Sequence, residues 1–162
     1  MTQSQIKNIF FVLLSCLLFF LELILFAVMQ QYEIYLLLCF FIALIVQQPQ
    51  HRTLVAPLCL MSMMSYLEMN IFGWCLVYIM PTMMLANYLD QHLRIKVIIP
   101  YLLITAALCI KMSLGWYMHG ITVSCMHATQ ILTYNTIVIA LFLSIGAYLE
   151  TKFENYLSKR IQ

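Results

Sequence analysis

The sequence predicts an all-α membrane protein, a polytopic bundle of six transmembrane helices with both termini in the cytoplasm. Of its 162 residues, 64% are apolar and 9% are charged, whereas soluble domains are typically about 45–50% apolar and about 25% charged. So few charged side chains cannot keep so much apolar surface in water, and the surrounding solvent must largely be lipid. The length fits one domain, and no stretch resembles a linker.

Six apolar runs separated by short polar segments define the expected spans, since about 20 residues cross the hydrocarbon core of a bilayer. They cover residues 9–29, 32–46, 53–67, 71–89, 97–117 and 131–149. The first run is longer than a signal-peptide core and lacks a cleavage site, so we expect a retained helix. The second and third are short, and either cross a thin membrane or are partly re-entrant. Pro81 should kink the fourth helix.

The distribution of Lys and Arg gives the expected orientation. Six spans put both termini on one side, and nearly all of the basic residues fall on that side: Lys7, Arg52, Arg94, Lys96, Lys152, Lys159 and Arg160. The exception, Lys111, lies within a span. Because cytoplasmic loops are enriched in Lys and Arg, this asymmetry predicts that both termini are cytoplasmic.

Residues 150–162 are expected to form a cytoplasmic tail. Phe153, Tyr156 and Leu157 recur at helical spacing, and charged residues take the other face. Such an amphipathic helix either lies on the lipid headgroups or presents a docking face to a partner.

Two ionisable residues lie deep inside predicted spans, where charge is costly and usually has a purpose. Glu22 lies about 10 Å and Lys111 about 9 Å below the outer boundary, and Asn135 comes to a similar level at about 6 Å. These three residues define a candidate buried polar cluster in an outward-facing cavity that binds a solute or a polar group of a partner. The alternatives are a structural pair that fixes helix packing, or a lysine that snorkels outward by itself.

Three further positions are candidates for contacts. Glu68 lies in the short hairpin predicted between the third and fourth spans, where it either contacts a partner or forms a solvated loop tip. Ala140 and Ser144 form a small-xxx-small step that would let another helix approach closely.

No set of residues indicates catalysis, a cofactor or a metal. The paired carboxylates of intramembrane aspartyl enzymes are missing, and so are C-x-x-C, G-x-S-x-G and H-E-x-x-H motifs. His119, Cys125 and His127 match no zinc spacing, and the six cysteines lie mostly in apolar runs, where they act as small hydrophobes. Nucleic-acid binding is not expected, since no basic patch is present.

Part of the chain resembles the rod shape-determining protein MreD family. The resemblance covers roughly residues 32–89: a Leu-rich short span, YEIYLLLCFFIALIV, a turn containing QPQHR at 48–52, a second short span ending in Glu68, and Gly73 before the next helix. The family usually has Asp at the acidic position and a longer interval before the glycine. Chain length and six spans with cytoplasmic ends also look like this family.

The resemblance implies a non-enzymatic subunit of the bacterial cell-elongation machinery, which scaffolds peptidoglycan synthesis beside MreC and the synthase formed by RodA and a penicillin-binding protein. In architecture, MreD resembles the S components of energy-coupling-factor vitamin transporters, which supply the alternative function. An S component would have an Ala-rich docking face on its first helix, and the first span here has only Ala27. The candidate polar cluster of Glu22, Lys111 and Asn135 modestly favours this alternative function. A third possibility is a membrane protein with neither role.

Overall fold

The structure is a computed structural model that describes residues 3–28, 33–47, 51–69, 71, 73–93, 96–120 and 124–161. Residues 3–7, 51–53, 69, 118–119 and 149–161 are described by their backbone alone. The described chain contains six α-helices, which confirms the prediction of an all-α, six-helix protein. They are α1 (Gln3–Val28), α2 (Leu36–Gln47), α3 (His51–Met69), α4 (Cys75–His92), α5 (Ile99–His119) and α6 (Cys125–Ile161), with a short 3₁₀ turn, η1 (Lys96–Ile98), before α5.

Three helical segments of the described chain are long and apolar enough to cross a membrane. They are Asn8–Val28, Lys96–Tyr117 and Cys125–Tyr148, and the shortest has 21 residues, or about 31 Å at 1.5 Å per residue. Two further apolar helices, Leu36–Gln47 and Leu54–Glu68, are shorter. The 12 residues of α2 reach about 18 Å, short of the hydrocarbon core of about 30 Å.

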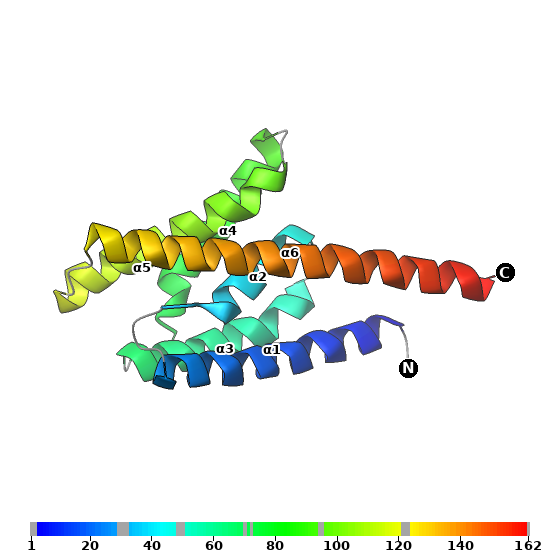
Figure 1. Ribbon diagram of the computed structural model, residues 1–162, viewed down its shortest axis with the longest axis horizontal. Coiled ribbons are helices and arrows are strands. Elements are labelled where there is room, and N and C mark those ends of the chain that lie inside the picture. Colours follow the sequence, from blue (N-terminus) through cyan, green and yellow to red (C-terminus); the bar gives the residue numbers. More distant parts are fainter. Residues whose placement is uncertain are drawn as a thin grey trace.

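The last helix differs from the expected element boundaries. α6 begins at Cys125, before the predicted start at residue 131, and continues for 37 residues to Ile161. A helix of this length spans about 55 Å, more than a bilayer with its headgroups at about 40–45 Å. The backbone of residues 150–161 therefore extends α6 along the same axis, away from the other helices (Figure 1).

The short helix α2 forms the centre of the fold, and this position explains its composition. Every residue from Leu37 to Leu44 is buried. The apolar residues of α2 therefore cover all sides of the helix and are not confined to one face. α2 packs against α1, α3, α5 and α6. α1 packs mainly on α3, and α4 packs mainly on α5.

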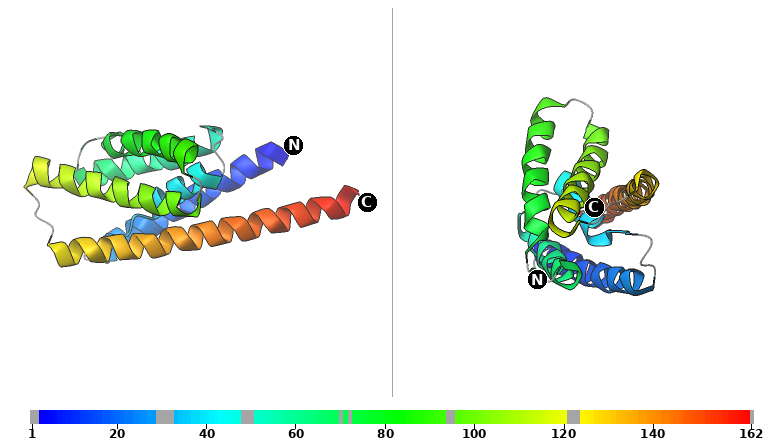
Figure 2. Two further views of the ribbon diagram at one scale, coloured as in Figure 1. Left: turned by 90° about the horizontal axis from the view of Figure 1, so that it is seen from above. Right: turned by 90° about the vertical axis from the view of Figure 1, so that its left-hand side faces the viewer.

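The two ends of the described chain lie on the same side of the molecule. The beginning of α1 and the end of α6 lie toward the same end in both Figure 1 and the left view of Figure 2, and α6 begins at the opposite end.

Gly120 ends α5 in the left-handed conformation, with φ of 64°, and its N–H donates to the Trp116 carbonyl at 2.9 Å. Such a C-cap suits glycine, which lacks a Cβ.

Large apolar side chains cover the outer faces of α1 and α6. Those more than half exposed are Leu13, Leu17, Phe20, Ile24 and Val28 on α1, and Met126, Ile137, Leu141, Ile145 and Tyr148 on α6. Exposed apolar surface of this extent marks contact with a membrane or with other proteins.

Candidate functional site

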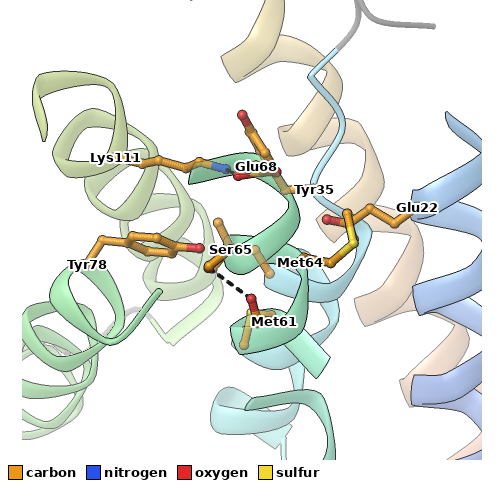
Figure 3. A pocket seen from close by; sticks show the side chains of 9 residues that line it. Glu22, Tyr35, Met61, Met64, Ser65, Glu68, Tyr78 and Lys111 are labelled. Carbon is orange, nitrogen blue, oxygen red and sulfur yellow. Dashed lines mark hydrogen bonds and ion pairs between the residues drawn. The ribbon is translucent and has the colours of Figure 1, made fainter. Parts of the chain in front are cut away.

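A small polar cavity lies where α1, α2, α3, α4 and α5 converge (Figure 3). Its volume is about 10 Å³, which is on the scale of one water molecule. The lining residues are Glu22, Tyr35, Leu38, Met61, Met64, Ser65, Glu68, Tyr78 and Lys111. The cavity thus brings together Glu22 and Lys111 from the predicted cluster, and it adds Glu68.

Lys111 on α5 forms an ion pair with Glu68 on α3. Its Nζ lies 2.7 Å from Oε2 of Glu68, and the two side chains are 9% and 15% exposed. The same Nζ lies 3.6 Å from the centre of the Tyr35 ring and 6.0 Å from that of Tyr78, so cation–π attraction adds to the ion pair. Lys111 is therefore held inside the fold, by a different carboxylate from the expected Glu22.

Glu68 also differs in its position from the sequence-based expectation. The residue lies in the last turn of α3, which continues to Met69, and not in an exposed hairpin. Its carboxylate faces Lys111 across the cavity (Figure 3). As a result, Glu68 joins α3 to α5, and its predicted contact with a partner is untested.

Glu22 on α1 caps the N-terminus of α2. Its Oε2 accepts a 2.7 Å hydrogen bond from the backbone N–H of Leu37, and Glu22 is only 6% exposed. The first N–H groups of a helix have no partner within the helix, and an acidic oxygen there also interacts favourably with the helix dipole. The side chain thereby fixes the start of the central helix against α1.

Asn135 on α6 holds the extended segment before α2. Its Oδ1 accepts a hydrogen bond of 2.8 Å from the backbone N–H of Tyr35. Its Nδ2 donates hydrogen bonds to the carbonyl of Glu33 at 3.0 Å and to that of Ile131 at 2.8 Å. Asn135 is fully buried. It does not line the cavity, and Tyr35 connects it to Lys111.

Glu33 links this extended segment to the start of α6. Its Oε2 accepts a hydrogen bond of 2.6 Å from the hydroxyl of Tyr35, and its Oε1 lies 3.8 Å from Nε2 of His127. His127 thus faces a carboxylate. Within the part of the chain that the structure describes, no group of three or more His, Cys, Asp or Glu residues is placed to hold a metal ion.

On α6, a glycine beside the predicted small-residue step lies close to another helix. Ser144 is exposed, and its hydroxyl donates to the Ala140 carbonyl at 2.8 Å within the helix. α2 approaches α6 closely at Gly146, where a Cβ would collide with the side chain of Gln47 at the end of α2. Gln47 also donates to the Leu143 carbonyl at 3.1 Å.

The remaining predicted positions stay predictions. Pro81 lies inside α4, where it removes one backbone donor, and the expected kink is untested. The structure places the backbone of Phe153, Tyr156 and Leu157 in α6 but does not describe their side chains, so their predicted contacts are untested.

Two tyrosines that shape the cavity were not among the predicted site residues. Tyr35 and Tyr78 supply its aromatic walls, and in the sequence they lie within apolar runs. Tyrosine buried in such a run usually needs a partner for its hydroxyl, and this was the signal available for both.

The arrangement joins helices and leaves little room for a ligand. Glu22, Glu68, Lys111 and Asn135 all contact groups on other elements of the same chain, and small-molecule pockets typically enclose about 300–1,000 Å³. No protein-family model, curated protein or solved structure matches this chain.

Proposed function

We propose that this chain is a non-enzymatic integral membrane subunit of the bacterial cell-elongation machinery, which scaffolds peptidoglycan synthesis through protein–protein contacts. The observation that carries the proposal is how the buried polar residues are used. Lys111 pairs with Glu68, and Glu22 caps α2. The polar side chains expected to recognise a solute are thus used to hold the bundle together, and the outer surface is left to interact with other molecules.

In this proposal the chain crosses the bacterial inner membrane six times, with both ends in the cytoplasm. The basic residues support this topology, because apart from Lys111 they all fall on the side of the termini. The start of α1 and the end of α6 lie toward the same end of the molecule, as an even number of crossings requires (Figure 2). The helix α2 covers only about 18 Å of its crossing, and its packing against α1, α3, α5 and α6 shields this part of the chain from lipid.

The partners are other membrane proteins, similar to MreC and to the synthase of RodA and a penicillin-binding protein, together with membrane lipids. The outer faces of α1 and α6 offer broad apolar surfaces for lateral helix contacts. Residues 150–161 extend α6 by about 18 Å beyond residue 149. This favours a tail that meets a cytoplasmic partner over one that lies flat on the headgroups.

Affinity purification of the tagged protein from native membranes tests the proposal. We expect an MreC-like protein or the elongation synthase to co-purify in mild detergent. A variant that ends at residue 149 serves as the matched control for contacts made by the tail. Recovery of an ATPase pair with its coupling subunit, or of a bound vitamin, would instead identify an S component of a vitamin transporter and overturn the proposal.

A further inference from the structure

The polar cavity contains more acidic than basic groups. Glu22 and Glu68 both line it, and Lys111 is the basic residue among its lining residues. Lys111 lies 2.7 Å from Glu68 and over the ring of Tyr35. Its positive charge is therefore committed to Glu68, and Glu22 has no comparable cationic partner among the residues that line the cavity.

The surroundings of Glu22 compensate a negative charge only in part, because the start of α2 offers backbone N–H groups whereas the side chain is buried. The described groups that face it from the neighbouring elements are Glu68 on α3, Lys111 on α5, Tyr78 on α4, and Tyr35 and Cys39 before and within α2. Backbone N–H groups at the start of α2 interact with its carboxylate, and that of Leu37 donates to Oε2 at 2.7 Å. An ionised carboxylate accepts about four hydrogen bonds, and an unpaired charge is costly inside a protein and more so within a membrane.

We propose that Glu22 is a proton-binding site, whose carboxyl group carries one proton that exchanges with the aqueous phase through the polar cavity. Protonation makes the cavity electrically neutral: one neutral carboxylic acid, one carboxylate and one ammonium. The cavity has room for about one water molecule to relay the proton. Glu68 and Lys111 lie toward its more exposed side, since their side chains retain 15% and 9% exposure.

Proton release would change the contacts between helices. An ionised Glu22 competes with Glu68 for the ammonium group of Lys111, and it repels the carboxylate of Glu68. Glu22 lies on α1 and caps α2, whereas Glu68 lies on α3. The packing of α1 and α2 against α3 is therefore expected to respond to pH.

Infrared spectroscopy of the purified full-length protein tests this proposal directly, because a protonated carboxylic acid has a C=O stretching band that a carboxylate lacks. We expect this band at neutral pH in the wild-type protein and its loss in Glu22→Gln, which preserves the acceptor for the Leu37 N–H. Glu33→Gln is the matched control and should retain the band, since Glu33 is 40% exposed and lies near His127.

A second variant tests the role of Lys111. In Glu68→Gln, the ammonium group of Lys111 is free to pair with Glu22, so most of the band should be lost although Glu22 is present. Absence of the band in the wild-type protein at neutral pH, or its persistence in Glu22→Gln, would overturn the proposal. Circular dichroism on the same samples shows whether each variant retains its helices, and absence of the band from the wild-type spectrum overturns the proposal even if a variant fails to fold.

Discussion

The ammonium group of Lys111 lies 2.7 Å from the carboxylate of Glu68, a residue 43 positions earlier in the chain. This contact ties the end of α3 to α5 across the interior, where a lone charge would be costly. Lys111 also lies over the ring of Tyr35, which precedes the central helix α2. One basic side chain thus joins three parts of the fold.

Removal of the lysine charge should destabilise the protein strongly. Lys111→Met leaves Glu68 without its cationic partner at a mostly buried position, and we expect the free energy of unfolding to fall by about 2 to 3 kcal/mol. Unfolding in detergent micelles measures the effect. The double variant Lys111→Met, Glu68→Gln should recover part of the loss, because no unpaired charge remains; a loss equal to the sum of the single variants would show that the pair is not coupled.

Asn135 should be as important to stability as a buried charge. Asn135→Ala leaves the Tyr35 N–H and the Glu33 carbonyl without their partner, and we expect a loss of about 1 to 3 kcal/mol in the free energy of unfolding. Ser144→Ala is the control on the same helix, since its exposed hydroxyl bonds only within α6 among the described contacts. Its effect should stay within about 0.5 kcal/mol. Equal effects of the two changes would contradict this role for Asn135.

Two helical glycines should respond in opposite directions to alanine. Gly146→Ala pushes its new methyl group against the Gln47 side chain and disrupts the hydrogen bond from Gln47 to Leu143, at a cost of about 1 kcal/mol. Gly115→Ala meets no atom within 4 Å and should stabilise α5 by up to about 1 kcal/mol through helix propensity. Thermal unfolding of both variants measures the difference. Stabilisation by Gly146→Ala would show that α2 and α6 are not closely packed there.

Native Cys125 provides a test of membrane orientation. It is exposed at the start of α6, on the outer side in the proposed topology. A membrane-impermeant maleimide should label Cys125 in intact cells, and a Cys125→Ser variant should lose this label. Asp90→Cys, in the last turn of α4 at the opposite side, should react only after the membrane is permeabilised. The reverse pattern would invert the topology.

The pattern of apolar residues was sufficient to predict an all-α fold. Long apolar runs such as 9–29 and 97–117 form helices in a membrane, because a helix satisfies its backbone hydrogen bonds within the segment. It was less informative where neighbouring helices decide the boundaries. α2 is buried on all sides, so its sequence lacks the amphipathic period that would reveal its orientation. The start of α6 at Cys125 lies in a mixed polar segment that resembled a loop.

The sequence predicts similar depths in the membrane for Glu22, Lys111 and Asn135. Depth alone does not determine which of these side chains contact one another. That choice depends on the rotation of each helix about its axis and on which helices are neighbours. Glu68 was assigned to a loop because the apolar run stops at Leu67. In the structure α3 continues past Leu67 to Met69, which brings Glu68 to Lys111. A buried lysine with two candidate carboxylates was the signal that the sequence offered.

The central claim is that this chain works by holding other membrane proteins at its outer surface. Photo-crosslinking in living cells tests it most directly, with p-benzoylphenylalanine introduced in turn at Leu13 and Phe20 on α1 and at Leu141 and Ile145 on α6, all more than half exposed. We predict light-dependent adducts with membrane proteins of the cell-elongation machinery from at least one of these faces. Well-expressed, folded variants that give no protein adduct from either face would contradict the claim.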